Sequence, residues 1–91
     1  MSVKVRIPTV LQKLSDGNRE LFVDGATVGQ VLVAVGDQHR DLLARVTTDT
    51  GAVRPFLNVF VNGDDIRFAS DLDTAVRDGD EISIIPSIAG G

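Results

Sequence analysis

Apolar and polar residues alternate in several short stretches of the chain, and each such stretch predicts a half-buried strand. Residues 3–7 read VKVRI, with the two valines and the isoleucine on one face, and residues 19–23 read RELFV. The side chains of a strand point alternately to its two faces, so a period of two directs one set of residues toward a core. The cluster SDGN at residues 15–18 is rich in turn formers. The two stretches are therefore expected to form a hairpin.

A period of 3.6 residues follows and predicts a helix. Apolar residues spaced i, i+3, i+4 and i+7 form a stripe made of Val28, Val31, Leu32 and Val35. Thr27 is a suitable N-cap, because its hydroxyl can accept a hydrogen bond from an N–H of the first turn. The helix is expected to run to about His39. The apolar residues at 42, 43 and 46 predict a short further turn of helix, and the polar residues that follow predict a loop.

Alternation returns in the second half of the chain. Residues 56–61, FLNVFV, predict a strand with Leu57, Val59 and Val61 on one face and the other three residues on the opposite face. The dipeptide at 62–63, Asn-Gly, is a strong signal for a tight hairpin turn.

Three further segments complete the expected order of elements. Residues 66–68 are expected to be extended, and residues 70–81 are expected to form a capped turn with Leu72 and Val76 directed inward. Residues 81–86, EISIIP, predict a final strand with Ile82 and Ile84 directed inward.

This order of elements predicts an α+β domain, with one main helix packed on one face of a mixed sheet. A final strand beside the first would pair with it in parallel, which a helical crossover permits. The length of 91 residues suits one domain. We expect the domain to occupy residues 1–86 and a flexible tail to occupy residues 87–91, because Pro86 removes a backbone donor and is expected to stop strand pairing there.

Composition narrows the range of functions. The chain carries a net charge of −4, and its basic residues are scattered singly, whereas nucleic-acid binders need a basic face. It contains no cysteine, which excludes disulfides, thiolate chemistry and iron–sulfur clusters. No apolar leader or membrane span is recognisable. We therefore expect a cytoplasmic protein that binds neither nucleic acid nor membrane.

The sequence offers no catalytic constellation. His39 is the single histidine, and in that position a solvated residue near a helix end is the expected role. Most acidic residues lie in turns, where they hydrogen-bond the backbone. No metal-ligand spacing, G-x-S-x-G motif or phosphate-binding glycine loop is present. We expect no catalytic residue, no metal and no cofactor.

The last residues of the sequence carry a different kind of chemistry. Pro86 is followed by SIAGG. A narrow enzyme channel can grip the backbone of a Gly-Gly pair, because no side chain obstructs it. A carboxylate is a poor acyl donor, but its adenylate is a good one. Gly91 is thus the expected site of adenylation, with Ser87, Ile88, Ala89 and Gly90 threaded into a partner enzyme.

Three motifs in this order resemble the ubiquitin-like sulfur carriers of the MoaD/ThiS family: NVFVNG at 58–63, DGDEISIIP at 78–86 and the final AGG. The resemblance covers nearly the whole chain and implies a β-grasp fold. It also implies that an E1-like enzyme adenylates Gly91 with ATP, and that a sulfur donor then converts the carboxylate to a thiocarboxylate. The carrier would be a protein cosubstrate and not an enzyme.

Within the family, the start of the chain and the long loop before residue 56 are most similar to the sulfur carrier of cysteine biosynthesis from O-phosphoserine. That resemblance implies a cysteine synthase as sulfur acceptor and a metalloprotease that releases cysteine. The small subunit of molybdopterin synthase is close behind, and a carrier for a thiazole or another thio-metabolite stays open.

The alternation of the last two long strands predicts a docking patch. If Val59 and Ile84 face the helix, Phe60 and Ile85 lie on the exposed face of the sheet near the tail, the usual recognition surface of ubiquitin-like folds. In the alternative interpretation, the long loop covers Phe60. Two other function classes also remain, a protein modifier joined to lysines and a passive β-grasp binding module.

Overall fold

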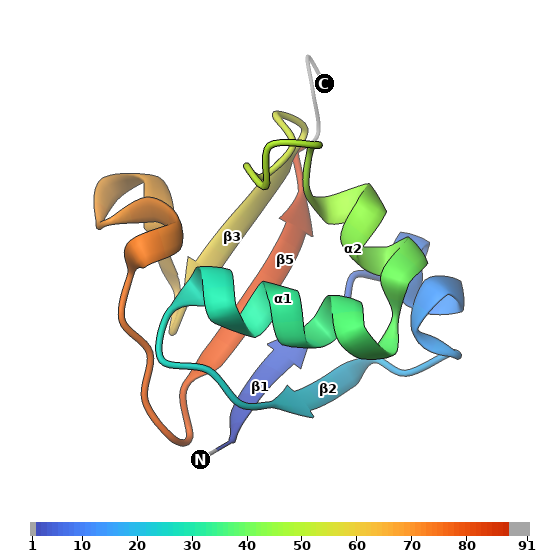
Figure 1. Cartoon of the computed structure of the whole chain (residues 1–91), viewed down its shortest axis with the longest axis horizontal. Helices are drawn as coiled ribbons and strands as arrows, with labels where there is room; N and C mark the ends of the chain where they lie inside the picture. The colour runs from blue at the N-terminus through green and yellow to red at the C-terminus, as the bar shows by residue number, and fades with distance from the viewer. Residues whose placement is uncertain (1, 88–91) are drawn as a thin grey trace.

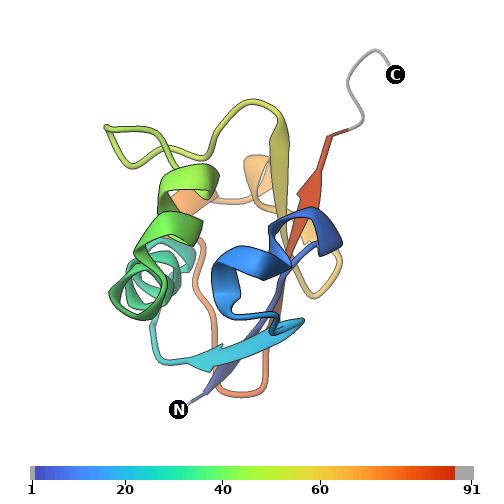
Figure 2. The ribbon, with the colours of Figure 1, turned by 90° about the vertical axis from the view of Figure 1, so that its right-hand side faces the viewer.

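The computed structural model describes residues 2–87 and consists of one mixed five-stranded sheet with helices on one face. The strands are β1 (Val3–Arg6), β2 (Glu20–Val23), β3 (Leu57–Val61), β4 (Asp64–Asp65) and β5 (Glu81–Pro86). The helices are α1 (Val28–Gln38) and α2 (Arg40–Val46). In Figure 1, α1 crosses in front of the sheet, and Figure 2 shows the helices and the sheet as separate layers.

The sheet has the strand order β2-β1-β5-β3-β4. The first two strands form the expected antiparallel hairpin, with Val5 opposite Leu21. The last strand lies in the centre, parallel to β1 and antiparallel to β3. The sequence indicated that a last strand lying beside the first would pair with it in parallel, and the structure shows this parallel pairing. Together with the helix on one face, this arrangement is the β-grasp fold.

The main helix begins where its cap predicts. The hydroxyl of Thr27 accepts a hydrogen bond from the N–H of Gln30 at 3.2 Å, and the Gln30 side chain in return accepts one from the N–H of Ala26 at 2.9 Å. These two bonds satisfy N–H groups that have no partner within the helix. The helix ends at Gln38, with His39 as its C-cap. A short second helix follows, as the apolar cluster at 42–46 indicates.

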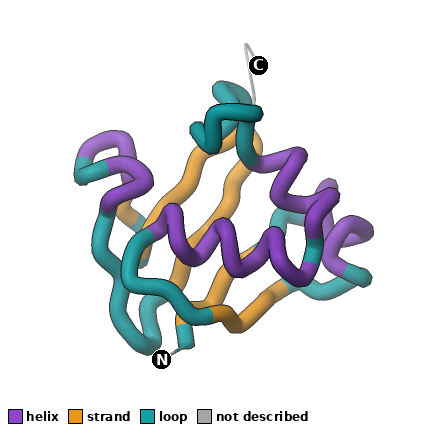
Figure 3. Tube along the Cα trace, in the orientation of Figure 1, coloured by secondary structure: helices purple, strands orange, loops and turns teal. Residues whose placement is uncertain are grey.

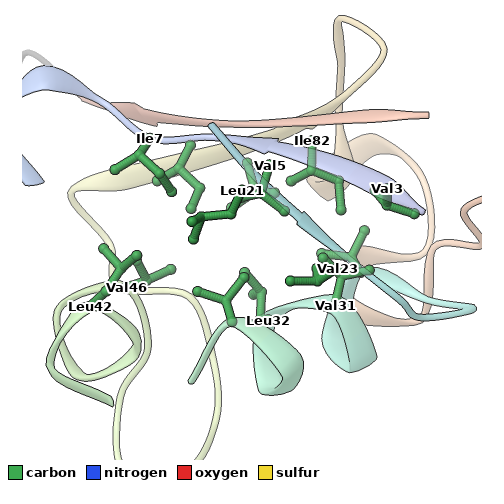
Figure 4. Packing of buried hydrophobic residues seen from close by; sticks show 14 of the residues in the cluster. Val3, Val5, Ile7, Leu21, Val23, Val31, Leu32, Leu42, Val46 and Ile82 are labelled. Carbon is green, nitrogen blue, oxygen red and sulfur yellow. The ribbon is translucent and has the colours of Figure 1, made fainter. Parts of the chain in front are cut away.

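The core lies between the sheet and the helices (Figure 4). Val5 and Ile82 from the sheet and Val31 from α1 are fully buried. The apolar stripe of α1 and the inward residues of β1 and β5 are all buried, as alternation and periodicity predict. Val61 is only partly buried, although it packs against the core.

The two helices approach each other closely at Gly36, where no side chain separates them. A Cβ atom added to Gly36 would collide with the side chain of Leu43. The partly buried Leu43 therefore packs directly against the backbone of α1.

Two segments differ from the sequence-based expectations (Figure 3). Residues Thr9–Ser15 form a 3-10 helix that no periodicity indicated. The expected extended conformation at 66–68 is wrong, because Ile66–Phe68 forms a 3-10 helix. Asp65 caps this helix by accepting the N–H of Arg67 at 2.9 Å. The side chain of an aspartate readily accepts a hydrogen bond from the backbone N–H two residues later, which forms a local turn. Here this bond favours the turn over the extended conformation that the short alternating pattern indicated.

Candidate functional site at the end of the sheet

The C-terminal end of β5 is held by β3 up to the last described residue. Ile85 lies opposite Asn58 and Pro86 lies opposite Leu57. Beyond them, the N–H of Ser87 donates a hydrogen bond to the carbonyl of Phe56 at 2.8 Å. The strand ends at Pro86 as predicted, but the hydrogen bonding to β3 continues one residue further than the proline suggested.

The position of Pro86 in the ladder explains this continuation. Hydrogen-bonded and non-bonded pairs alternate along an antiparallel ladder. The bond between Ser87 and Phe56 puts Pro86 in a non-bonded pair, so its missing N–H would have pointed away from β3. On that side β1 pairs only as far as Ser83. Pro86 therefore removes no hydrogen bond from the pairing with β3.

Phe60 and Ile85, the two residues of the predicted docking patch, both lie on the face that α1 leaves open. Phe60 is opposite Ser83, and Asn58 is opposite Ile85, so the two apolar side chains are diagonal neighbours across the strands. Ile85 is 45% exposed, whereas Phe60 is partly buried. The structure places the two residues together, and their role in docking stays a prediction.

A groove of about 960 Å³ lies on the same open face and reaches the end of β5. Its lining combines apolar and polar side chains from β1, β2, β5 and the first 3-10 helix, including Arg6, Gln12, Arg19, Phe22, Ser83 and Ile85. No pattern in the sequence predicted this groove. The only signal was the alternation of β1 and β2, which predicts their outward residues but not the 3-10 helix that forms one wall.

The charges on the open face are largely paired. Lys4 Nζ lies 3.7 Å from Glu20 Oε2, and Arg6 Nη1 lies 3.4 Å from Glu81 Oε2. Such exposed pairs contribute little to stability. The open face around the groove therefore carries both positive and negative charges, although the chain is acidic overall.

Parts of two motifs that suggested the family, Asn62-Gly63 and residues 78–81, form one polar cluster at the opposite end of β5. Asn62 and Gly63 adopt positive φ angles of 50° and 91°, as a tight hairpin turn requires. The Asn62 side chain donates to Asp80 Oδ1 at 3.1 Å and accepts the N–H of Glu81 at 2.9 Å. This bond from Asn62, together with one from the N–H of Arg77, holds the pKa of Asp80 below its ordinary value. Hydrogen bonds between the NG and DGDE motifs therefore link the hairpin turn at Asn62 to the turn at residues 78–80.

Elsewhere, the acidic residues serve local structure. Arg67 donates from Nη2 and Nε to Asp65 Oδ2 at 2.7 and 3.1 Å. This contact lowers the pKa of Asp65. His39 differs from expectation, because its side chain is only 10% exposed, and its Nδ1 lies 4.0 Å from Asp16 Oδ2. Within residues 2–87, no three His, Cys, Asp or Glu side chains form a group suited to a metal ion.

The remaining predicted site residues, Ile88, Ala89, Gly90 and Gly91, lie outside the described residues. Ser87 lies at the boundary and is exposed apart from its backbone bond. In the described part of the chain, no helix has the length and apolar character needed to span a bilayer.

Comparison with known proteins identifies relatives over the whole chain. The model of the ThiS family matches residues 5–91. The sulfur carrier protein CysO of Mycobacterium tuberculosis is 34% identical over 93 residues, covering 100% of both chains. Small archaeal modifier protein 1 of Haloferax volcanii is 40% identical over 78 residues, covering 82% of this chain and 85% of the modifier.

Among solved structures, a chain in the BexX/CysO complex of Amycolatopsis orientalis superposes with a TM-score of 0.90 and 37% identity. The match covers 98% of this chain and 99% of that chain. The family match includes the β-grasp body, the polar cluster at Asn62 and the final glycines. The chain belongs to the ThiS family of ubiquitin-like sulfur carriers.

Proposed function

We propose that this protein carries sulfur as a thiocarboxylate on Gly91. The carboxylate oxygen of Gly91 would attack the α-phosphorus of ATP in an E1-like activating enzyme, releasing pyrophosphate and forming an acyl adenylate. A sulfur donor then supplies the nucleophile that displaces AMP. The net change is one carboxylate oxygen replaced by sulfur, and the thiocarboxylate passes this sulfur to an acceptor.

One observation carries the proposal: the likeness to CysO extends over the full length of both chains and thus includes the segment after β5. The described body is consistent with a protein cosubstrate whose chemistry is supplied by its partners. An open groove lies beside the end of β5, from which the chain continues toward Gly91.

We further propose that the acceptor is a cysteine synthase that uses O-phosphoserine, with a metalloprotease releasing cysteine from the carrier. The likeness to CysO, at 34% identity, supports this choice over other acceptors. Molybdopterin synthase, in which this chain would be the small subunit, is the next candidate. A thiazole or another thio-metabolite is a further candidate product. The likeness to a chain of the A. orientalis BexX/CysO complex supports a partner similar to BexX.

The open face is the proposed docking surface for these enzymes. Ile85 and Phe60 lie diagonally on it, and Phe56, whose carbonyl accepts the N–H of Ser87, is 54% exposed. An apolar surface close to the tail would let a partner bind the body while its channel takes Gly91.

A second candidate function is conjugation to lysines as a protein modifier. The likeness to small archaeal modifier protein 1 favours this candidate. Both functions use the same adenylate, and they differ in whether sulfur or an amine displaces AMP. Conjugates of higher mass in cell extract, absent when Gly91 is deleted, would support the modifier function.

The test is the intact mass of the purified protein after incubation with ATP, a sulfide source and its cognate activating enzyme. The expected result is a gain equal to the replacement of one oxygen by one sulfur, absent in a variant that lacks Gly91. An unchanged mass with an activating enzyme of proven activity would overturn the sulfur-carrier proposal.

A further inference from the structure

The sheet ends on one side in β2, and the outer backbone groups of this strand have no partner. Hydrogen-bonded and non-bonded pairs alternate along the ladder between β1 and β2. Because the N–H of Ile7 donates to the carbonyl of Arg19, Glu20 and Phe22 fall in the non-bonded pairs. Their N–H and C=O groups therefore point away from β1. No other group in the described part of the chain hydrogen-bonds to them.

The two edges of the sheet differ in how they are protected against a further strand. At the other edge, β4 has only two residues, and both are aspartates; short edge strands and charged side chains hinder pairing with another chain. In contrast, β2 pairs with β1 without a bulge, contains no proline and has Glu20 as its only charged side chain. In Figure 1, no helix or strand lies beyond its outer side. A further strand can therefore be added to β2.

The spacing of the unpaired groups suits a second copy of the same strand. Glu20 and Phe22 flank Leu21, so a two-fold axis through Leu21 places Glu20 of each copy opposite Phe22 of the other. Each such pair exchanges two hydrogen bonds, and all the unpaired groups of both strands are then used. In the two neighbouring registers, Glu20 would instead lie opposite Glu20 or Asp24 of the second copy, and like charges directly opposite each other destabilise a sheet.

The same register covers the exposed aromatic side chain of β2. Phe22 is 62% exposed on the open face and lines the groove together with Glu20. In the paired strands, Phe22 of one copy lies opposite Glu20 of the second copy and diagonal to its Phe22, within reach of an aromatic ring. Because the two-fold axis is perpendicular to the sheet, the open faces of both copies lie on the same side. The second copy thus contributes residues to the edge of the groove.

We propose that two copies of this protein associate through β2 into one continuous sheet, in which Glu20 of each copy is hydrogen-bonded to Phe22 of the other. The pairing involves the described body alone and does not depend on the chemistry at Gly91. Strands of four residues make a smaller interface than stable dimers have, and each copy carries a net charge of −4. The dimer should therefore form at high protein concentration and be promoted by salt, which screens the repulsion.

The absence of cysteine from the sequence allows a clean cross-linking test. Glu20→Cys and Phe22→Cys place thiols at two exposed positions. The Cα atoms of a hydrogen-bonded pair lie about 5.5 Å apart, which is within the range that a disulfide spans. In an oxidised mixture of the two variants at high concentration, the disulfide that joins one variant to the other should form at least tenfold faster than the dimer of either variant alone.

Val33→Cys is the matched control for random collision, because Val33 is 60% exposed on α1 and lies away from the paired edge. It should cross-link no faster than either β2 variant alone. Cross-linking in the mixture at the rate of Val33→Cys would overturn the proposed pairing. Faster cross-linking of Glu20→Cys or of Phe22→Cys with itself than of the mixture would overturn the proposed register.

A second pair of variants tests the backbone hydrogen bonds. Phe22→Pro removes the outward N–H but no bond to β1, because Phe22 lies in a non-bonded pair. Phe22→Ala removes the ring and keeps the N–H. In sedimentation velocity at rising concentration, the wild type should associate, Phe22→Ala should associate more weakly, and Phe22→Pro should stay monomeric. A wild type that is monomeric even at millimolar concentration, or equal association of the two variants, would overturn the proposal. Melting temperatures check that both variants are folded.

Discussion

The face of the sheet that α1 covers and the face that it leaves open are built from alternate residues of the same strands. Ile82 and Ile85 show the contrast, since both are isoleucines of β5, yet Ile82 is fully buried and Ile85 is 45% exposed. The covered face carries valine, leucine and isoleucine almost throughout. The open face carries charged pairs, a serine and a few large apolar side chains.

This contrast separates stability from recognition. Burial of the covered face supplies most of the favourable free energy of folding, because that energy scales with the apolar area removed from water. The open face contributes little to that burial. Its residues are therefore not constrained by core packing and can serve the binding of partner proteins. The open face also lies beside the end of β5, from which the chain continues toward Gly91. Changes on one face should affect stability, and changes on the other should affect the proposed loading reaction.

The largest expected effect comes from neither face. Deleting Gly91 should abolish the gain of sulfur completely, because the remaining terminal carboxylate is displaced by one residue from the reacting position. The melting temperature should not change, since glycine has no side chain whose burial could contribute to stability. Intact mass and calorimetry on the same sample measure both quantities. A loaded variant would show that Gly91 is not the site.

The next effect is expected on the covered face. Ile82→Ala should lower the free energy of unfolding by about 2–5 kcal/mol, because it leaves a cavity at a fully buried position. Urea unfolding measures this loss. At a temperature where the variant is still folded, its loading rate should match that of the wild type. A lowered rate in the folded variant would show that the two faces are not separable.

A smaller effect is expected on the open face of the same strand. Ile85→Ala should cost less than about 1 kcal/mol of stability, but should raise the KM for adenylation by the activating enzyme about tenfold. Val33→Ala is the control, because Val33 is 60% exposed on α1. The same KM for both variants and the wild type would argue against a docking role for Ile85.

The smallest effect concerns the polar cluster at the opposite end of β5. The pKa of Asp80 is lowered in the folded protein, whereas an unfolded aspartate titrates near about 3.9. The stability from this group is therefore present above about pH 4 and lost as the pH falls below it toward the folded pKa.

Asp80→Ala should consequently lower the unfolding midpoint in urea at pH 7, and the difference from the wild type should shrink at pH 3. Asp73→Ala serves as the control, since Asp73 is exposed and lies in a separate short 3-10 helix, Asp71–Asp73. A difference for Asp80→Ala that stays constant with pH would show that its carboxylate does not act through the bonds from Asn62 and Arg77.

Periodicity along the chain is enough to predict most of the β-grasp body. The alternation at β1, β3 and β5 and the stripe of α1 predicted the strands, the helix and the buried residues, because burial on one face imposes a period of 2 or 3.6. Capping at Thr27 and the turn at Asn62 were also predicted, since both depend on a few neighbouring residues. The identity of Gly91 as the reacting residue came from chemistry and resemblance, and it remains a proposal.

Features that join residues far apart in the sequence emerged only from the folded chain. The groove requires β1, β2, β5 and the Thr9–Ser15 helix together, and that 3-10 helix is too short to show a periodic pattern. The low exposure of the His39 side chain depends on packing around the junction of the two helices, which no local pattern encodes. The bond from Ser87 to Phe56 depends on the register of β3 against β5. A proline lacks the backbone N–H on one side of its strand only. The sequence could not tell whether the missing N–H of Pro86 would have pointed toward β3 or away from it.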